Sequence, residues 1–399
     1  MTKYIICLGD GMSDEPLASL NNKTPLEYAN SPEMDALAKA GQTGLVHTVP
    51  EGCHPGSDVA NMGILGYDPR NYYTGRGPIE AASMGITPNK NQIIFRCNLV
   101  TIENNIMKEF TAGHISDAEG EALMAELNEH FQSESDIQFF SGVGYRHIVL
   151  LNQKFLNLKT TAPHDILDQN VTTFLPQGDL QNEMEAFILE AREVLKNSKI
   201  NKHRIEKGLP AATDIWPWSQ GRLPELPSFK TKFEKTGGII TAVDLLKGLA
   251  QLTGLEAPQV EGATGFMDTN YANKLSESLR ILDTHDFVYI HVEAPDECGH
   301  MGDEKLKTKA IEDFDKEIIG PVKAYVEKNP DTVVLVLPDH PTPCHLKTHT
   351  SKPVPFILYS PALAPDQSQH YSEKEAESGS LKFSYPWELL SHFLSINSK

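Results

Sequence analysis

The sequence has few cysteines, no long apolar run and a deficit of positive charge. Five cysteines among 399 residues include no Cys-x-x-Cys pair, which argues against a secreted disulfide framework. A membrane-spanning helix needs about 18 consecutive apolar residues, and no stretch of the sequence approaches that length. Thirty-five Lys and Arg stand against 54 Asp and Glu, so the formal net charge of −19 disfavours nucleic acid or an anionic membrane as partner. We therefore expect a cytoplasmic protein, with room for a small anionic ligand in a local basic pocket.

The apolar residues that are present predict an α/β fold. At 399 residues, of which 40% are hydrophobic, the chain is long enough for two domains. Helical patterns separate short apolar runs, among them two long amphipathic segments at 268–282 and 305–328. Alternating strands and helices predict a mostly parallel sheet between helical layers. The predicted strands are 4–8, 44–49, 239–243, 287–292, 332–337 and 354–359.

The middle of the chain has a different pattern. Between 88 and 236 the segments are shorter and mixed, which indicates an inserted, smaller α+β domain. The core is then discontinuous, formed by 1–87 and 237–399. Within the insert the stretch 215–227, rich in Trp and Pro, is typical of a loop. The other predicted segments of the insert are helices at 117–131 and 179–196 and strands at 95–100 and 147–151.

Acidic residues follow three of the predicted core strands. Asp10, Asp296 and Asp339 come at or just after the ends of 4–8, 287–292 and 332–337. Ligands of open α/β sheets bind beyond the carboxyl ends of parallel strands, so these carboxylates are expected on one rim. A single Asp at such a place is commonly a helix N-cap. Three of them indicate a site.

Histidines accompany these carboxylates and suggest metal binding. His300 is four residues after Asp296, on the same face if this segment is helical. His340 is adjacent to Asp339, and His349 follows a Pro-containing turn. Mixed carboxylate and imidazole ligands suit Mn²⁺ first, with Zn²⁺, Co²⁺ or Mg²⁺ as alternatives. With one serine added, the donors are too many for one tetrahedral ion, so we expect two divalent ions.

The serine is Ser57, which follows Pro55-Gly56 and precedes a predicted helix at 59–65. Such a position has free backbone N–H groups that favour an anion. On spacing alone Ser57 could simply be the helix N-cap. Beside a metal rim it is better interpreted as a nucleophile, because metal coordination lowers the pKa of a hydroxyl.

Several longer motifs are spread along the chain, at 8–12, 23–27, 55–58, 66–69, 75–78, 262–265, 268–269, 294–300 and 339–343. Together they resemble the archaeal-type cofactor-independent (2,3-bisphosphoglycerate-independent) phosphoglycerate mutases of the alkaline phosphatase superfamily. The resemblance covers nearly the whole chain.

The resemblance implies a two-metal core, a phosphoserine intermediate and a reaction that interconverts 3-phosphoglycerate and 2-phosphoglycerate. It also implies how the donors are divided. One metal would be held by Asp10, Ser57, Asp339 and His340. The other would be held by Asp296, His300 and His349. Lys247 resembles a lysine that stabilises the transferring phosphoryl group.

The predicted insert is expected to bind the small phosphorylated acid. Arginine grips phosphate and carboxylate through two parallel donors. His164 and Asp165 follow a proline and could contact the substrate hydroxyls, with Asp165 as a base. Trp216, Trp218 and Arg192 are expected to be structural or solvated. The candidate substrate-binding arginines are Arg96, Arg146, Arg204 and Arg222.

Other functions stay open at the sequence level. The segments 80–82 and 348–351, together with Pro338, look closer to a bacterial branch that has been proposed to phosphorylate homoserine. The alternative is therefore phosphotransfer to homoserine or another small alcohol on the same scaffold. A plain phosphatase or sulfatase has no need for a large insert, and a non-catalytic metal protein has no need for Ser57. Metal identity and oligomeric state are left undetermined.

Overall fold

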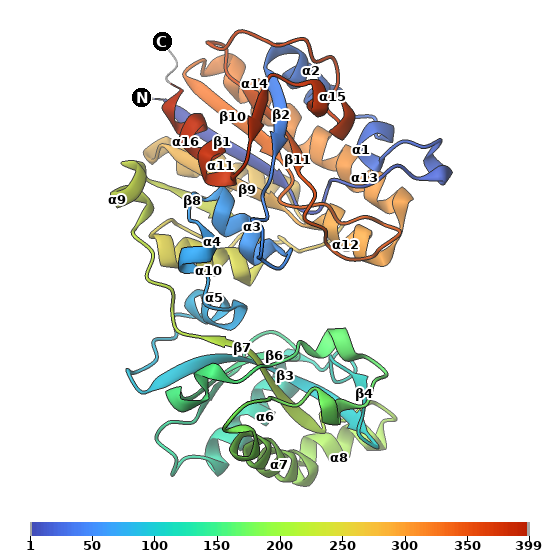
Figure 1. The fold of residues 1–399 in the computed structure, drawn as a ribbon, viewed down its shortest axis with the longest axis vertical. Helices are drawn as coiled ribbons and strands as arrows, with labels where there is room; N and C mark the ends of the chain where they lie inside the picture. Colours follow the sequence, from blue (N-terminus) through green and yellow to red (C-terminus); the bar gives the residue numbers. More distant parts are fainter. Residues whose placement is uncertain (1, 397–399) are drawn as a thin grey trace. The chain divides into compact units, whose positions relative to one another are not determined.

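A seven-stranded sheet forms the core of the chain (Figure 1). The computed structural model describes residues 2–396. All six predicted core strands are present, in the sheet order β12-β2-β11-β10-β1-β9-β8. Strands β10, β1, β9 and β8 run parallel, whereas β11 runs antiparallel to both β10 and β2, which corrects the expectation that it is parallel. The strands are β1 (Lys3–Gly9), β2 (Gln42–Val46), β8 (Gly237–Ile240), β9 (Phe287–Val292), β10 (Thr332–Leu337), β11 (Val354–Tyr359) and β12 (Leu381–Phe383).

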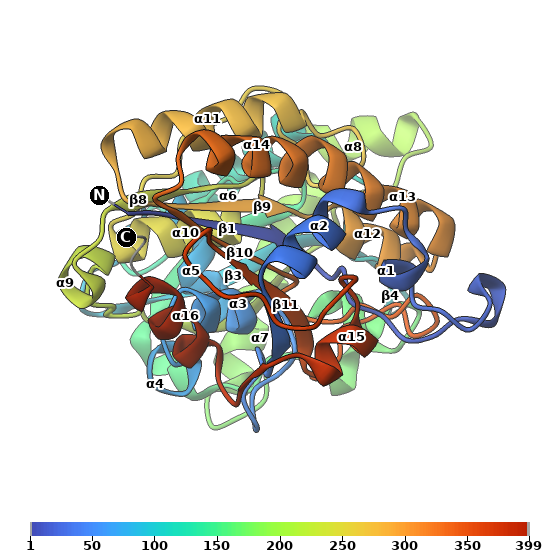
Figure 2. The ribbon, with the colours of Figure 1, turned by 90° about the horizontal axis from the view of Figure 1, so that it is seen from above.

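Helices cover both faces of this sheet, which makes the three expected layers (Figure 2). One layer contains α2 (Pro32–Ala40), α11 (Tyr271–Thr284), α13 (Glu304–Phe314) and α14 (Gly320–Lys328). The other contains α3 (Ser57–Ile64), α10 (Asp244–Thr253) and α16 (Pro386–Ser395). A π-helical turn, Asp315–Ile319, joins α13 to α14, so the predicted helix 305–328 is interrupted in its middle. Shorter helices are α1 (Pro25–Tyr28), α4 (Pro69–Tyr72), α9 (Phe229–Phe233), α12 (Ala294–Met301) and α15 (Glu373–Ser378).

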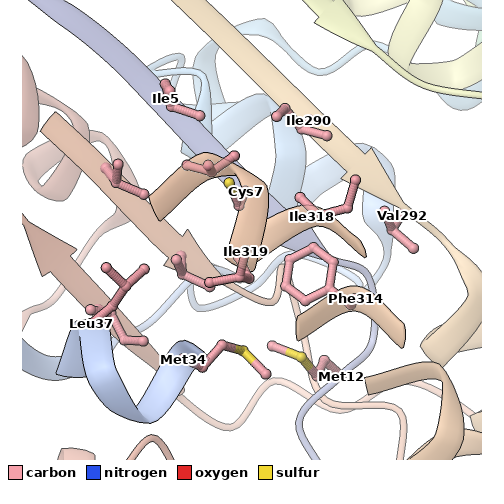
Figure 3. Close-up of a cluster of buried hydrophobic side chains, with 14 of the residues drawn as sticks. Ile5, Cys7, Met12, Met34, Leu37, Ile290, Val292, Phe314, Ile318 and Ile319 are labelled. Carbon is pink, nitrogen blue, oxygen red and sulfur yellow. The ribbon is translucent and has the colours of Figure 1, made fainter. Parts of the chain in front are cut away.

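The alternation of side chains along β1 explains why both faces are covered. Ile5 and Cys7 pack with Phe314 in a buried cluster under the first helical layer (Figure 3). Tyr4 lies on the opposite face, edge-on to Phe393 of α16, with ring centroids 5.4 Å apart. Successive residues of a strand point to opposite faces, so the apolar run from Tyr4 to Leu8 needs an apolar partner on each side. The catalytic side chains are therefore expected only where the strands end.

Residues Thr74–Pro224 form a second unit with its own five-stranded antiparallel sheet. Helices α6, α7 and α8 cover one face, where they meet Phe95, Cys97 and Leu99 of β3. Arg96 and Asn98 alternate with these residues and so face the other side. The elements are α5 (Arg76–Ser83), β3 (Gln92–Glu103), β4 (Ile106–Glu109), α6 (Asp117–His130), β5 (Gln138–Phe140), β6 (Arg146–Asn152), α7 (Gln181–Asn197), α8 (Lys199–Glu206) and β7 (Asp214–Gly221).

Two predictions for this region are corrected. The stretch expected as a loop at 215–227 begins as strand β7, which pairs with β3 and buries Trp216 and Trp218. The unit begins at Thr74 rather than at 88, because α5 packs against β3 and β7. It ends at Pro224 rather than at 236, because Phe229 packs on Phe287 of the core at a centroid distance of 4.7 Å.

No helix within residues 2–396 combines the length and the apolar character that crossing a bilayer requires. All five cysteines are free thiols, and four of them are buried.

Candidate metal centre and nucleophile

The loops that follow β1 and β10 meet the start of α3 in one buried cluster. Ser57 Oγ lies 3.1 Å from Nε2 of His340. The same nitrogen lies 3.4 Å from Oδ2 of Asp339 and 3.7 Å from Oδ1 of Asp10. Gly56 is the N-cap of α3 and Ser57 is its first helical residue, so the reading of Ser57 as the N-cap is wrong. Its hydroxyl is directed to the histidine instead of to the helix backbone.

A second cluster adjoins the first through His340. Helix α12 starts just after β9 and carries Asp296 and His300 on one face, with His300 Nε2 3.2 Å from Asp296 Oδ2. His349 completes this triangle: its Nε2 is 3.4 Å from Asp296 Oδ1 and 2.9 Å from His300 Nε2. The rings of His340 and His349 lie 4.0 Å apart. The spacing of four residues between Asp296 and His300 therefore places both side chains on one face of a helix, as predicted.

The two clusters have the composition and burial of a divalent cation site. Asp10, Asp296 and Asp339 are at most 5% exposed. Oδ1 of Asp10 is buried and has no hydrogen-bond partner among residues 2–396. Burial raises the pKa of Asp10, and the neighbouring Asp339 and Asp296 carboxylates add to this effect. Buried carboxylates without compensating cations are unfavourable, so these donors fit divalent metal ions, which would neutralise them.

The second unit contains a separate cluster of arginines around one carboxylate. Glu80 Oε1 lies 2.8 Å from Nε of Arg76 and 3.2 Å from Nη1 of Arg96. The guanidinium of Arg96 stacks on Trp218, with Cζ 4.9 Å from the ring centroid. Although burial opposes it, the charges of Arg96 and Arg76 lower the pKa of Glu80. One carboxylate facing two guanidiniums leaves a net positive charge, which is the chemistry of an anion-binding surface.

Comparison with known proteins identifies the family. A family model described as 2,3-bisphosphoglycerate-independent phosphoglycerate mutase matches residues 38–201. A probable enzyme of that name from Geobacter sulfurreducens is 46% identical over 95% of this chain and 96% of its own. The Methanosarcina acetivorans enzyme of that name is 44% identical over 95% of this chain and 96% of its own.

The chain belongs to the 2,3-bisphosphoglycerate-independent phosphoglycerate mutase family.

Solved structures agree with this assignment. A cofactor-independent phosphoglycerate mutase from Thermoplasma acidophilum superimposes with a TM-score of 0.67 at 26% identity, covering 99% of both chains. A protein of Pyrococcus horikoshii superimposes with a TM-score of 0.82 at 28% identity, covering 98% of this chain and 96% of its own. The Methanosarcina and Thermoplasma proteins are named phosphoglycerate mutases and the Geobacter protein a probable one, and none of these names supports the homoserine alternative.

One of the predicted substrate-binding arginines, Arg204, is buried inside the second unit. Arg204 is 2% exposed and its donors are taken by Glu119 Oε2 and by the backbone oxygens of Ala112 and Pro210. It holds α8 to the start of α6 and has no free face for a ligand. Its prediction as a substrate residue is therefore corrected to a structural role.

The other predicted substrate residues differ in exposure. Arg146 is exposed and its guanidinium lies over Tyr145, 5.7 Å from the ring centroid. Arg222 is held by Gln153 at 2.6 Å. His164 packs edge-on to Trp218, at 5.4 Å, next to the exposed Asp165.

Two further residues complete the comparison with the sequence predictions. In the core, Lys247 lies in α10 and donates to Asp244 at 2.9 Å. Arg192, expected to be solvated, is half-buried and pairs with Asp214 at 2.6 Å.

Several residues that support the centre escaped the sequence analysis. Asn61 donates to Asp339 Oδ2 at 2.8 Å and to the carbonyl of Ser57 at 2.9 Å, and it accepts from the Tyr289 hydroxyl. Asn61 is four residues after Ser57, so helical spacing could have found it. His291 donates to Asp10, and its signal was a polar residue inside an otherwise apolar strand.

A buried lysine braces the two loops that carry the ligands. Lys307 of α13 donates to Asp14 Oδ2 at 2.8 Å and to the carbonyl of Thr342 at 2.8 Å. The Thr342 hydroxyl in turn donates to Asp296. Nothing in the amphipathic pattern of 305–328 distinguishes this lysine from its exposed neighbours.

Proposed function

We propose that this chain interconverts 3-phosphoglycerate and 2-phosphoglycerate through a phosphoserine formed on Ser57. The observation that carries the proposal is the convergence of Ser57 with six Asp and His side chains in a chain that is 46% identical to a probable mutase. The family supports the reaction, and the position of Ser57 beside the proposed metal donors supports its role in the covalent step. Related enzymes act without 2,3-bisphosphoglycerate, which is consistent with a protein group as the phosphoryl carrier.

We propose two divalent ions, with Mn²⁺ preferred. Asp10, Asp339, His340 and Ser57 would hold one ion, and Asp296, His300 and His349 the other. His340 lies near both groups. When bound, such ions lower the pKa of a serine hydroxyl and neutralise charge on a transferring phosphoryl group.

The covalent step begins with attack of Ser57 Oγ on phosphorus. Oγ gives up its proton as it bonds to phosphorus, the bond from phosphorus to the C3 oxygen of glycerate breaks, and that oxygen takes up a proton to become a hydroxyl. The 2-hydroxyl of the retained glycerate then gives up its proton as it bonds to phosphorus, the bond from phosphorus to Oγ breaks, and Oγ takes up a proton again. Ser57 is the first residue of α3, so the backbone N–H groups of this helix end favour the phosphoryl oxygens. Lys247 adds positive charge from α10, which packs on α3.

The acid groups of the substrate fit the arginine cluster of the second unit. Arg96 is held by Glu80 and stacked on Trp218, so its direction is fixed before a ligand arrives. Arg76 joins the predicted Arg96 and Arg146 as a candidate ligand, whereas Arg204 is no longer one. Arg222, His164 and Asp165 remain candidates for the hydroxyls and the second acidic group.

The direct test is an assay of the purified protein with 3-phosphoglycerate and Mn²⁺, followed by phosphorus NMR. We expect 2-phosphoglycerate to appear and inorganic phosphate to stay at the level of the uncatalysed sample. Absence of 2-phosphoglycerate, with phosphohomoserine formed when homoserine and a phosphoryl donor are supplied, would overturn the proposal. Release of inorganic phosphate alone would indicate a phosphatase.

A further inference from the structure

The two carboxylate oxygens of Asp10 have different surroundings. Oδ2 accepts a hydrogen bond from Nε2 of His291 at 2.9 Å. Oδ1 is buried without a hydrogen-bond partner in the described part of the chain, and it lies on the side of His340, 3.7 Å from its Nε2. One oxygen is therefore fixed by the protein and the other is left for a cation.

The histidine that holds Asp10 is itself held from the next strand. His291 is fully buried in β9, opposite Leu8 of β1. Its Nδ1 lies 3.2 Å from Oγ1 of Thr241, which directly follows β8. Thr241 Oγ1 also accepts a hydrogen bond from the backbone N–H of Val243 at 3.0 Å. A series of contacts thus crosses three neighbouring strands: Thr241 directly follows β8, His291 lies in β9, and Asp10 directly follows β1.

The direction of every hydrogen bond in this series follows from its two ends. A backbone N–H can only donate, so the Thr241 oxygen accepts from Val243. A carboxylate that binds a cation is ionised and can only accept, so Nε2 of His291 carries a hydrogen when the cation is bound. The Thr241 oxygen already accepts from Val243, so its own hydrogen is available for Nδ1 of His291, 3.2 Å away. A ring that donates at Nε2 and accepts at Nδ1 is one neutral tautomer of histidine.

We propose that Thr241 and His291 are positioning residues that orient Asp10 for the metal ion. Thr241 selects the tautomer of His291, His291 holds Oδ2, and the carboxylate plane turns Oδ1 toward the cation. Neither residue contacts the substrate in this proposal. The inference rests on the proposed function only through the divalent cation site, because it concerns metal affinity and not the identity of the substrate.

The backbone of His291 is anchored as well, which supports a positioning role. Lys274 of α11 is fully buried and donates to the carbonyl of His291 at 3.2 Å. The histidine is thus fixed at its main chain and at both ring nitrogens. Residues that orient a metal-binding group through such contacts typically change metal affinity by about 10- to 100-fold when they are replaced.

The test compares Mn²⁺ affinity, measured by isothermal titration calorimetry on metal-stripped full-length protein, across three variants. Thr241→Val replaces the hydroxyl by a methyl of similar volume, and we expect Kd for Mn²⁺ to rise about 10- to 100-fold. Thr241→Ser keeps the hydroxyl and should stay within about threefold of wild type. Thr253→Val is the matched control, because Thr253 is equally buried but its hydroxyl donates only to carbonyls of its own helix. His291→Gln, whose amide can still donate to Asp10, is a second route if Thr241→Val does not fold, and Kd should rise less than for His291→Ala.

Each result decides the matter. Wild-type affinity in Thr241→Val, or equal losses in Thr241→Val and Thr253→Val, would overturn the positioning role. If Thr241→Val fails to fold, equal Kd values for His291→Gln and His291→Ala would overturn it. If Thr241→Val binds Mn²⁺ more weakly but the wild type has no mutase activity, the positioning role stands and the proposed function is refuted. If the wild type is a fully active mutase and Thr241→Val binds Mn²⁺ with wild-type affinity, the proposed function stands and the positioning role is refuted.

Discussion

Ser57 Oγ lies 3.1 Å from Nε2 of His340, although 283 positions separate the two residues in the chain. The contact exists because β2, which precedes α3, runs in the same direction as β10, with the antiparallel β11 between them, so the segments that follow both strands leave the same edge of the sheet. His340 is fully buried, and burial lowers its pKa, so the ring is suited to accept a cation or a hydrogen bond rather than to carry a proton. The proposed nucleophile and the proposed metal donors therefore lie in one buried cluster.

Replacing the nucleophile should stop the reaction without unfolding the protein. Ser57→Ala is expected to lower kcat for 2-phosphoglycerate formation by at least about 10³-fold, because no other hydroxyl adjoins His340 Nε2 among the described hydrogen bonds. Far-ultraviolet circular dichroism and the melting temperature should stay close to wild type. A Ser57→Ala enzyme with more than a tenth of wild-type kcat would rule out the phosphoserine.

Removing the metal should affect both activity and stability. Chelation leaves three buried carboxylates uncompensated, so we expect loss of mutase activity and a lower melting temperature, both restored by added Mn²⁺. The stabilisation should increase with the logarithm of the Mn²⁺ concentration above Kd. Asp10→Asn is the matched variant, and its melting temperature should respond less to Mn²⁺. An unchanged melting temperature after complete metal removal would contradict the assignment of these donors.

Glu80 should affect substrate affinity more than turnover. Glu80→Gln removes the charge that holds Arg76 and Arg96, so KM for 3-phosphoglycerate is expected to rise about tenfold or more with a smaller change in kcat. The variant is also expected to lose about 1.5–3 kcal/mol of unfolding free energy, because a largely buried charged hydrogen bond is removed. A fall in kcat with an unchanged KM would argue against a binding role for this cluster.

The stability contributed by Glu80 should depend on pH in a defined direction. Its arginine neighbours, working against burial, lower the pKa of Glu80 below the ordinary value of 4.5. A carboxylate with a lowered pKa stabilises the fold above its unfolded pKa and loses that effect as pH falls through its folded value. The difference in unfolding free energy between wild type and Glu80→Gln should be constant near neutral pH and shrink below about pH 4.5. Urea titrations at several pH values measure it, and a difference that grows on acidification would refute the assignment.

Arg96 and Arg204 should separate binding from structure. Arg96→Ala is expected to raise KM about 30-fold or more, because a preorganised guanidinium is lost. Arg204→Ala should instead lower the unfolding free energy, by about 3 kcal/mol, and leave KM nearly unchanged, since its donors are taken by Glu119 and two carbonyls. Steady-state kinetics and denaturant titration of both variants distinguish the two roles. A reversed pattern would place the ligand at Arg204.

The strand ends and the ligand spacing of the core could be predicted from the sequence because they depend on local pattern. Asp10, Asp296 and Asp339 follow apolar runs, and parallel pairing brings such ends together. The antiparallel direction of β11 could not be predicted, since its apolar run is the same whichever way the strand is oriented. The stretch at 215–227 was predicted as a loop because of its prolines, whereas it begins in β7, an edge strand of its sheet, where proline is tolerated.

The roles of the arginines depended on tertiary partners that no spacing reveals. Arg96 and Arg204 are both nearly fully buried, yet the donors of Arg204 are taken by Glu119 and two backbone carbonyls, whereas Arg96 contacts the Glu80 carboxylate and an aromatic ring. The sequence identifies both as arginines in the insert and nothing more. The resemblance to the mutase family supplied the division of the metal ligands, which composition alone leaves open.

The most direct test of the central claim is to locate the phosphoryl group during turnover. Wild-type protein loaded with Mn²⁺ is mixed with 3-phosphoglycerate that carries a radiolabelled phosphoryl group, quenched in acid within the first turnovers and digested for peptide mass spectrometry. We predict that the label and the added mass of phosphate occur on Ser57 alone, and that 2-phosphoglycerate forms at the same time. In the Ser57→Ala variant the corresponding peptide should carry no label. Rapid formation of 2-phosphoglycerate with no phosphate on Ser57 at any quench time would contradict the account.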